Sequence, residues 1–560
     1  MSAVPVLSAR LTAAATAAFG LTVDPELRAA TKPEFGHFQT SVALRLAKQL
    51  GRAPRQIAEQ LVAQAQLDDM CTLDVAGPGF INLTLLPSTL AAGVNELPES
   101  LPRNGRTVVV DYSQPNVAKQ MHVGHLRSTV IGDALCNVLA YAGYEVVRQN
   151  HVGDWGTQFG MMVEQLLAEG TPAEGLDLEA MQQLYQRSRR HFDSDPAFAD
   201  LSRRRVVLLQ SGDPQTRGIW QQLVDISLSE FDRVYTLLGS PLTQADVVGE
   251  SAYNADLPGI VDDLRAAGLL TESEGAQCAF LDGFTGRDGS PLPVIVRKSD
   301  GGFGYSATDL AAVRHRVRDL RADRIVYVVD HRQSLHFQQI FALARAADWL
   351  PETTTAEHVA FGTVLGPDGK PFKTRDGGTV YLVSLLDAAV ERAATLLADL
   401  EGIDRDAVAR AVGIGAVKYA DLSSDRTNDY VFDLDRMVAM TGNTGPYLQY
   451  AHARLTRLLT KAGTADGKVT VLQEPAEQRL ALLLAGFDDA VLQVAETLQP
   501  HRLCTYLYDV ATALSAFYES CPVLTSDGET RTSRLALCAA TRGVLHDGLA
   551  LLGMTAPDAM

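Results

Sequence analysis

Apolar runs and amphipathic segments alternate near the middle of the chain. TVVVDYS (107–113) is an apolar run typical of a buried strand, and the next segment, 122–144, repeats apolar residues at helical spacing until Gly143 ends the pattern. EVVRQNHVGD (145–154) again has the composition of a strand. Because a strand, a helix and a second strand in this order form a βαβ unit, the pattern predicts a parallel sheet and an α/β core.

The segments before this unit predict a smaller α+β domain. Helical patterns near 7–19 and 39–65 flank a turn, and GPGFINLTLL (77–86) reads as a glycine turn that runs into an alternating strand. The proline-containing polar stretch 97–106 has the composition of a linker.

The segments after the unit are mostly helical. A charged helical stretch covers 165–240, and two further strand-like runs, 293–301 and 324–332, are separated by a helix. From about residue 379 onward nearly every segment is an amphipathic helix. We therefore expect the chain to end in helical regions.

The composition restricts the class of protein. With 560 residues, 46% of them hydrophobic, the chain is long enough for three or four domains, and it has no apolar run that would span a bilayer. The N-terminal helical pattern lacks the charged start and cleavage site of a secretory signal. Six scattered cysteines without a CxxC pair favour a reducing cytoplasm and argue against a structural metal site.

The net charge of −18 disfavours indiscriminate binding to nucleic acid. The segment RHRVRDLRADR (314–324) reverses this charge locally, with five arginines against two aspartates. It fits either a specific RNA contact or a solvated helix face, and its spacing does not separate the two.

His122 and His125 stand at the start of the central predicted helix, with Gly124 between them. In an open α/β sheet this helix start lies at the carboxyl end of the preceding strand, where ligands bind and free N–H groups favour phosphate. Imidazole N–H groups can donate to phosphate oxygens, and a glycine lets a flat ring approach the backbone. A metal-binding pair and polar caps without chemistry are the alternatives.

The sequence around these histidines resembles the class I aminoacyl-tRNA synthetases, in which HVGH corresponds to the HIGH motif. DYSQPNVAKQMHVGHLRSTVIGDAL (111–135), followed by HVGDWGTQFG (151–160), is similar to the arginyl-tRNA synthetase family in particular. Further motifs match that family in the same order from about residue 76 to the C-terminus: YSATDLAA, VYVVDHRQSLHFQQIFALAR, HVAFGTVLGPDGKPFKTRDGGTV, NTGPYLQYAHARL and ALSAFYESCPVL.

The resemblance implies a fold class and a domain organisation. We expect an α/β protein in which a Rossmann-type parallel-sheet catalytic domain carries an N-terminal α+β add-on domain and an all-helical C-terminal domain. The expected regions are the add-on domain that touches the tRNA D-loop (1–105), the catalytic domain with insertions (106–365), a KMSK-like loop with a helical stem-contact region (366–440) and a helical anticodon-binding domain (441–560).

The implied function is that of a cytoplasmic, monomeric arginine–tRNA ligase without membrane contact. It would convert L-arginine to arginyl-adenylate with ATP, whose phosphates bring Mg²⁺, and without a structural metal. It would then transfer arginine to the terminal adenosine of tRNA(Arg), and activation would need bound tRNA. A tRNA-independent HxGH nucleotidyltransferase and a catalytically silent tRNA-binding paralogue are the alternatives.

The residues expected to act on ATP lie on two segments. His122, Gly124 and His125 supply donors and a close backbone approach, and no general base is needed because the attacking carboxylate is already an anion. The loop that corresponds to KMSK reads GKPFKTRDGG and departs from that pattern. Its basic residues are Lys370, Lys373 and Arg375, for which a solvated basic turn is the alternative. Lys119 resembles the lysine that compensates in family members with a degenerate loop.

Selection of arginine requires acceptors that match a planar guanidinium. Asp309 can accept it bidentately, and Tyr305 and Gln333 would complete the pocket. Thr308 and Asp309 can instead be read as the cap and first-turn acid of a helix. By resemblance, the α-amino and carboxylate ends of arginine would meet a second set of residues: Asp111, Ser113, Gln114, Pro115, Asn116 and His125.

The expected tRNA contacts are implied by the resemblance. On the first helix of the C-terminal domain they are Tyr447, Gln449, Tyr450, His452 and Arg454. Aromatic side chains there can stack on unpaired bases, although a packing stripe would have the same spacing. In the N-terminal domain Phe80 and Asn82 share one face of a strand, and ordinary core is the alternative for Phe80. His37 stands where an acid is usual in the family.

Overall fold

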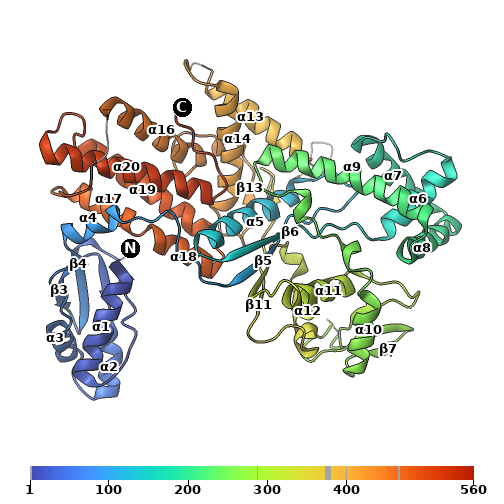
Figure 1. The fold of residues 1–560 in the computed structure, drawn as a ribbon, viewed down its shortest axis with the longest axis horizontal. Helices are drawn as coiled ribbons and strands as arrows, with labels where there is room; N and C mark the ends of the chain where they lie inside the picture. The colour runs from blue at the N-terminus through green and yellow to red at the C-terminus, as the bar shows by residue number, and fades with distance from the viewer. Residues whose placement is uncertain (1–2, 287, 373–379, 399, 464–466) are drawn as a thin grey trace.

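Three lobes lie around a central parallel sheet in the structure, a computed structural model that describes residues 3–286, 288–372, 380–398, 400–463 and 467–560 (Figure 1). The N-terminal domain, a group of helices from the middle of the chain and the C-terminal helices each form one lobe. The helix α5 (Val123–Tyr141) lies at the centre, where they meet. Lys373 and Arg375, two of the predicted loop residues, lie outside the described residues.

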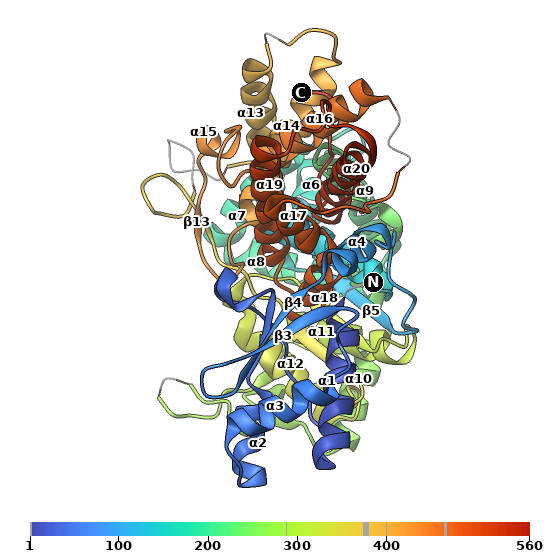
Figure 2. The same cartoon turned by 90° about the vertical axis from the view of Figure 1, so that its left-hand side faces the viewer.

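The N-terminal domain is an antiparallel sheet of order β1-β2-β4-β3, packed against helices (Figure 2). Its elements are α1 (Ala3–Phe19), β1 (Arg28–Ala29), η1 (Pro33–Phe35), β2 (Phe38–Thr40), α2 (Val42–Leu50), α3 (Pro54–Gln64), β3 (Cys71–Ala76) and β4 (Phe80–Leu85). The predicted helix 39–65 is divided in two. Gly51 ends α2 in a left-handed conformation, and Pro54 occupies the first position of α3.

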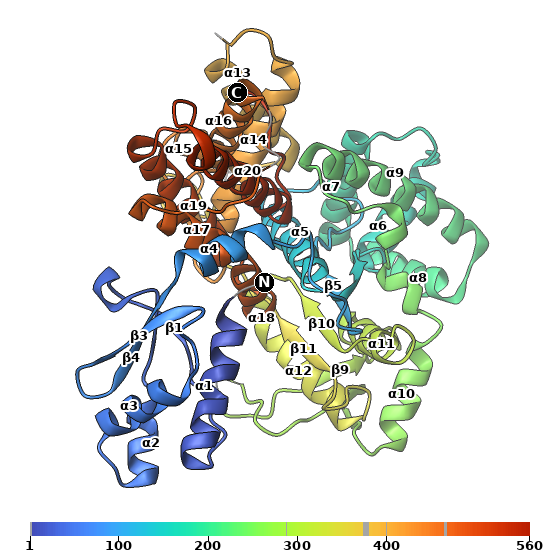
Figure 3. The ribbon, with the colours of Figure 1, turned by 60° about the vertical axis from the view of Figure 1, so that its left-hand side comes forward.

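Helix α4 (Pro87–Asn95) joins this domain to the C-terminal helices (Figure 3). It packs against α17 (Pro475–Ala485), where a Cβ on Gly93 would lie 2.8 Å from the Cβ of Ala485. The Asn95 side chain donates to the carbonyl oxygen of Val469 at 2.8 Å and accepts from its N–H at 2.9 Å. The N-terminal domain is therefore fixed to the helical region through close backbone contact.

The parallel sheet confirms the predicted βαβ unit. Its strand order is β11-β10-β5-β6, and every neighbouring pair is parallel. The strands are β5 (Thr107–Asp111), β6 (Glu145–Gln149), β10 (Arg324–Tyr327) and β11 (Thr355–His358). Gly143 adopts a φ of 89° just after α5 and so turns the chain into β6, as the helix-ending glycine predicts.

Helix α5 is buried around nearly its whole circumference. The predicted apolar residues Leu126, Val130 and Leu135 are at most 1% exposed. The polar residues are enclosed as well, because Arg127 forms an ion pair with Asp421 that is almost fully buried. Helices α14 (Arg405–Leu422) and α18 (Phe487–Thr497) cover the side of α5 that an amphipathic helix would expose to solvent.

The segments between β6 and β10 form two insertions. The first is helical and consists of α6 (Thr157–Glu169), α7 (Leu178–Ser194), α8 (Pro196–Ser211) and α9 (Pro214–Leu238). The second contains η2 (Gln244–Asp246), η3 (Glu250–Tyr253), α10 (Leu257–Ala266), β7 (Thr271–Ser273), β8 (Ala276–Ala279) and β9 (Val294–Arg297). The predicted strand 293–301 therefore lies in a separate antiparallel sheet of order β7-β8-β9.

The remaining elements follow the predicted helical pattern. They are α11 (Tyr305–Arg318), η4 (His331–Gln333), α12 (Ser334–Ala346), β12 (Val364–Leu365), α13 (Leu382–Leu396), β13 (Tyr430–Val431), α15 (Leu434–Met437), α16 (Gly445–Ala462), α19 (His501–Ser520) and α20 (Gly528–Leu551). The short parallel pair β12–β13 is the only strand pairing that the described residues show after β11.

The basic stretch 314–324 is used mainly inside the protein. Arg316 is fully buried beside Asp111, and Arg324 binds Glu357 and two backbone carbonyl oxygens. Arg314 forms an ion pair with Asp263. Of the five arginines, Arg318 and Arg321 stay exposed, and Arg318 pairs with Asp319, so the open basic surface of this segment is small.

Candidate active site

The loop after β5 is held in a strained conformation. Ser113, Gln114 and Ala118 have φ values of 70°, 51° and 68°, in the left-handed region that non-glycine residues rarely occupy. Each backbone N–H donates to a side chain from another element: to Ser128 Oγ, Asn150 Oδ1 and Ser227 Oγ respectively. These bonds fix the loop next to the start of α5, and strain of this kind is concentrated at functional sites.

The two histidines cap the start of α5 with their Nδ1 atoms. His122 Nδ1 accepts the N–H of Gly124 at 3.0 Å, and His125 Nδ1 accepts the N–H of His122 at 3.0 Å. A neutral ring nitrogen that accepts a hydrogen bond carries no proton, so each ring holds its proton on Nε2. Both histidines are therefore caps and, at the same time, Nε2–H donors. A Cβ on Gly124 would lie 2.8 Å from the His122 ring, so this position requires glycine.

Both rings are uncharged near neutral pH. Burial, followed by the proximity of His122, lowers the pKa of His125 to about 3. Burial also lowers the pKa of His122, and the charges of Lys119 and Arg332 lower it further. Arg332 was not among the predicted residues; both oxygens of Asp330 hold its guanidinium on η4. The helix start therefore offers neutral N–H donors with cations nearby.

Lys119 and the far end of the KMSK-like loop both contact the helix α7. The Lys119 ammonium lies 5.2 Å from the centre of the Tyr185 ring. Gln182, one turn earlier, donates to the hydroxyl oxygen of Tyr381, which follows the loop. The backbone of Val380 in turn accepts from the N–H of Val123 at 3.2 Å. The end of the loop is thereby tied to the histidine motif.

Lys370 lies on the near side of the same loop. Its carbonyl oxygen accepts the N–H of Gly366 at 2.8 Å and closes a turn, and Pro371 pairs with Leu365 of β12. The Lys370 side chain is exposed, which is compatible with both the phosphate role and the solvated-turn alternative.

Asp309 is mostly buried and does not lie at a helix start. Helix α11 begins at Tyr305 with Gly304 as its cap, so Asp309 is on the second turn and Thr308 is not a cap. The interpretation of Asp309 as a first-turn acid is therefore wrong. Its Oδ2 lies 2.6 Å from His336 Nε2, and its side chain is 14% exposed.

Glu250 is an acid that the sequence reasoning missed. It opens η3, and burial followed by the charges of Asp309 and Asp154 raises its pKa to about 8. No motif in the sequence signals its role, because the residues that surround it come from distant segments. An enclosed pair of carboxylates with one raised pKa has the electrostatic character of a site for a cation.

The other residues predicted for arginine differ in their accessibility. Asp111 is 1% exposed; its Oδ2 accepts from buried Arg316 at 2.7 Å, and its Oδ1 has no hydrogen-bond partner in the described structure. Asn116 and Gln333 are exposed, and Tyr305 is 64% exposed with its ring edge-on to His336. Asp111 is therefore already engaged by the protein, and so is Ser113, which is 2% exposed and whose hydroxyl contacts those of Tyr235 and Thr129.

Phe80 and Asn82 point to the same face of β4, opposite the buried Ile81 and Leu83. Asn82 Oδ1 accepts from the side chain of Gln39 at 2.7 Å and is 6% exposed, whereas Phe80 is half-buried. The prediction that they share a face is confirmed, and their contact with tRNA stays a prediction. His37, at a position where an acid is usual in the family, accepts the N–H of Leu85 through Nδ1 at 3.0 Å. This side chain is therefore held by a hydrogen bond to the backbone.

The residues predicted on α16 divide into two groups. Gln449 and His452 are at most 2% exposed and are hydrogen-bonded to backbone carbonyl oxygens, including those of Thr555 and Pro557. Contrary to prediction, these two side chains therefore have no surface to offer a tRNA in this structure. Tyr447, Tyr450 and Arg454 remain at the surface to different extents: Tyr447 is half-buried, Tyr450 is 44% exposed and Arg454 stacks on Tyr518.

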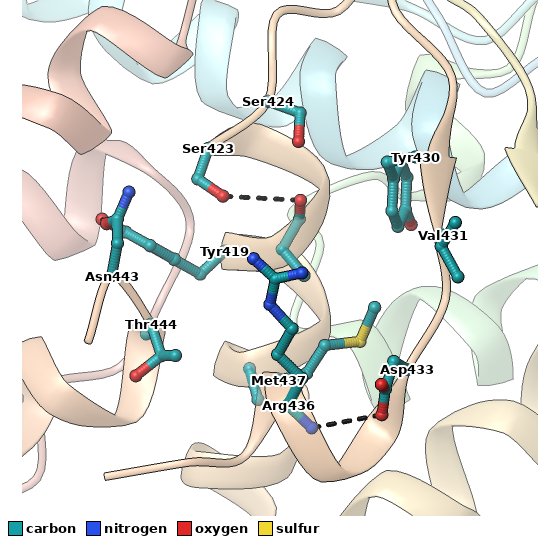
Figure 4. A pocket seen from close by; sticks show the side chains of 13 residues that line it. Tyr419, Ser423, Ser424, Tyr430, Val431, Asp433, Arg436, Met437, Asn443 and Thr444 are labelled. Atoms are coloured by element: carbon teal, nitrogen blue, oxygen red, sulfur yellow. Dashed lines mark hydrogen bonds between the residues drawn. The ribbon is translucent and has the colours of Figure 1, made fainter. Parts of the chain in front are cut away.

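A second pocket, of about 260 Å³, lies between α14, α15 and the start of α16 (Figure 4). Figure 4 shows the Arg436 side chain in its middle, with Asn443 and Thr444 on one side and Tyr430 on the other. None of the residues that line it belongs to the predicted adenylate site. Asp309, Glu250, His122 and His125 lie outside this pocket. They are the better candidates for small-substrate chemistry, because burial and neighbouring charges shift the pKa of Glu250 and of both histidines.

The described residues contain no group of three or more His, Cys, Asp or Glu side chains arranged to hold a metal ion. The metal-pair alternative for His122 and His125 is disfavoured further because both Nδ1 atoms are occupied by backbone N–H groups. Among the same residues, no helix combines the length and the apolar character that crossing a membrane requires. All six cysteines are buried and unpaired.

Comparisons with known proteins account for the whole chain. Three family models match consecutive parts: the arginyl-tRNA synthetase N-terminal domain (6–85), the catalytic domain of class I tRNA synthetases for arginine (86–434) and the DALR anticodon-binding domain (448–560). The arginine–tRNA ligase of Cutibacterium acnes is 54% identical over 99% of this chain and 100% of its own, and that of Thermobifida fusca is 50% identical over 99% of both.

Solved structures agree with this match. The crystal structure of the arginyl-tRNA synthetase from Plasmodium falciparum superposes with a TM-score of 0.86 at 29% identity and covers 100% of both chains. The arginyl-tRNA synthetase of Thermus thermophilus gives a TM-score of 0.84 at 26% identity, over 99% of this chain and 100% of its own. The chain belongs to the arginyl-tRNA synthetases, the class I ligases that join arginine to tRNA.

Proposed function

We propose that this arginine–tRNA ligase separates its chemistry between a donor-rich helix start for ATP and an acceptor-rich pocket for the arginine side chain. The single observation that carries the proposal is the opposite polarity of the two regions. His122 and His125 present neutral N–H donors, whereas Asp309 and Glu250 form an enclosed acidic pair.

In the activation step the carboxylate of arginine attacks the α-phosphorus of ATP and pyrophosphate leaves. The attacking group is already ionised, so the protein has to align the reactants and stabilise the charge that develops on phosphate oxygens. The Nε2–H groups of His122 and His125 would supply that stabilisation, and the positive end of the α5 helix dipole would add to it. Gly124 allows the nucleotide to approach the backbone closely.

The guanidinium of arginine would lie between Asp309 and Glu250. It is a planar group with five N–H donors, and two carboxylates satisfy more of these donors than one does. Tyr305 and Gln333 would close the pocket at its exposed side. The α-amino and carboxylate ends would contact the strained loop after β5, through Asn116, Ser113, Gln114, Pro115 and the free Oδ1 of Asp111.

Positive charge for the pyrophosphate would come from Lys119 and Lys370, together with Lys373 and Arg375 of the loop. Lys119 is held over Tyr185 beside the histidine motif, which supports its role as a replacement for the missing KMSK lysine. Mg²⁺ would enter with the phosphates of ATP, since the described residues provide no cluster of ligands for it.

The tRNA surface would include Phe80 and Asn82 on the N-terminal domain and Tyr447, Tyr450 and Arg454 on α16. We leave Gln449 and His452 out of it because both are enclosed by the protein. The requirement for tRNA in activation, a monomeric state, a cytoplasmic location and the boundaries at residues 105, 365 and 440 remain part of this proposal.

The substitution Asp309→Asn tests the pocket. An amide of the same size presents an N–H donor to the guanidinium, and a mismatch of this kind at a buried charge pair costs about 3 kcal/mol or more. We expect kcat/KM for arginine in tRNA aminoacylation to fall more than a hundredfold. Normal arginine kinetics in a folded variant would remove Asp309 from the pocket and return the residue to a structural role.

A further inference from the structure

His151 lies beside Asp309, and its two ring nitrogens have different neighbours. It follows β6, and its Nδ1 lies 3.1 Å from the carbonyl oxygen of Val248. A carbonyl oxygen only accepts hydrogen bonds, so the proton of the neutral ring is on Nδ1. The lone pair of Nε2 then points toward Asp309, whose Oδ1 lies 3.8 Å away. In this tautomer His151 Nε2 and Asp309 Oδ1 are two hydrogen-bond acceptors that lie 3.8 Å apart.

The second histidine of the pocket has the opposite role on the same carboxylate. His336 Nε2 lies 2.6 Å from Asp309 Oδ2, the distance of a charge-assisted hydrogen bond in which the ring donates. A proton on His151 Nε2 would favour a similar contact of about 2.7–2.9 Å with Oδ1. The separation of 3.8 Å shows no such bond, and the His151 side chain is 10% exposed.

We propose that neutral His151 is a specificity-determining residue that accepts an N–H bond of the arginine guanidinium through Nε2. This inference rests on the proposed function, in which Asp309 receives the guanidinium. One NH₂ group can reach both acceptors, because each bond spans about 2.9 Å and the acceptors are 3.8 Å apart. His151 thus adds an acceptor without adding another negative charge beside Asp309 and Glu250.

This arrangement discriminates against citrulline, in which a carbonyl oxygen replaces one NH₂ of the guanidinium. That oxygen would face the lone pairs of Nε2 and Oδ1, and none of these atoms could donate. A lysine ammonium would reach the acids but could not span all three acceptors with the planar fork of arginine. The uncharged ring therefore makes binding depend on the number of N–H groups that the ligand presents, as well as on the positive charge of the ligand.

Two substitutions of His151 separate this role from a structural one. In His151→Asn the amide N–H takes the place of Nδ1–H and keeps the bond to Val248, but the acceptor at the Nε2 position is lost. In His151→Gln the amide oxygen replaces the Nε2 acceptor, whereas the bond to Val248 is lost. We expect the KM for arginine in tRNA aminoacylation to rise about tenfold in His151→Asn, with kcat preserved, and to be largely restored in His151→Gln.

The same variants are measured for inhibition by citrulline. The Gln amide can turn and donate to the citrulline oxygen, so the ratio of the citrulline inhibition constant to the arginine KM should fall at least fivefold in His151→Gln. This measurement decides the question even where His151→Asn does not fold. His358→Asn is the matched control, since it breaks the contact of His358 Nε2 with another backbone carbonyl oxygen, that of Val329, and its KM for arginine should not change.

The opposite pattern would overturn the inference. The KM for arginine would then be normal in His151→Asn and raised in His151→Gln, and the ratio of the citrulline inhibition constant to the arginine KM would not change. Such a result would show that His151 only binds the carbonyl oxygen of Val248. Asp309→Asn is measured beside these variants. If Asp309→Asn is defective and His151→Asn is normal, only the role of His151 fails. If both bind arginine normally, the pocket itself is wrong.

Discussion

Arginine binding should become stronger with rising pH because of Glu250. Burial and the carboxylates of Asp309 and Asp154 raise the pKa of Glu250 to about 8, so this residue is mostly protonated in the free protein at pH 7. A guanidinium beside the carboxylate favours the ionised form, and binding then releases the proton. The affinity is therefore reduced below the free pKa, rises with pH as the proton is lost and levels off above about 8.

The size of the effect follows from that pKa. If arginine binds the ionised form alone, protonation of the free protein weakens binding by a factor of 1 plus ten to the power of pKa minus pH. The factor is about 11 at pH 7 and about 1.3 at pH 8.5 for a pKa of about 8. The KM for arginine should therefore fall roughly eightfold between these two values.

The assay is the initial rate of tRNA aminoacylation at saturating ATP and tRNA, with arginine varied at several pH values. Glu250→Gln carries no titratable group at this position and should abolish the pH dependence of the KM. Glu164→Gln is the matched control, because Glu164 is as enclosed as Asp309 but pairs with Arg205 outside the pocket. Ionisation of free arginine affects all three proteins equally.

Two results would refute this reasoning. A wild-type KM that stays constant from pH 7 to 8.5 would show that no proton is released when arginine binds. A pH dependence that survives in Glu250→Gln would assign the proton to another group.

Three further predictions concern activation. His125→Ala should slow adenylate formation by about 10²–10³ with little change in tRNA affinity, since one transition-state donor is lost; near wild-type turnover would exclude His125 from the reaction. Lys119→Ala should slow activation at least as much as Lys370→Ala, and the replacement role fails if the Lys119 variant is silent while Lys370 proves essential. Exchange of labelled pyrophosphate into ATP should be negligible with arginine alone and should appear when tRNA(Arg) is added; strong exchange without tRNA would favour a tRNA-independent enzyme.

The parts of the fold that depend on local pattern could be predicted from the sequence. The elements of the central βαβ unit, the glycine that ends α5 and the alternating strand 80–85 are each encoded within a short continuous segment. The histidine motif is local in the same sense, because its caps bind backbone groups two or three residues away. A pattern that involves only neighbouring residues is sufficient to predict the local structure that these residues form.

What depends on tertiary partners could not be predicted. A helical period identifies an apolar face but not whether another helix covers the polar face, which is why Gln449 and His452 were assigned to the surface. The motif around Asp111 does not indicate that its carboxylate is already paired, because its partner Arg316 lies 205 residues later. Burial, followed by the charges of Asp309 and Asp154, raises the pKa of Glu250, and no spacing rule connects these residues to it.

The neutral state of the two motif histidines has a consequence for the whole site. Arginine brings a cationic side chain and a cationic amino group to the same strand ends at which ATP phosphates must be stabilised. Permanently charged imidazolium rings at the start of α5 would attract the phosphates but repel both cations of the amino acid. Rings with a pKa as low as that of His125 donate N–H bonds without this repulsion, and Lys119 provides positive charge from beyond them. In the proposed arrangement Asp309 and Glu250 would face the guanidinium, and the Nε2–H groups of the two histidines would face the phosphates. A substitution that introduces a permanent charge at either histidine should therefore weaken arginine binding even where it strengthens the binding of ATP.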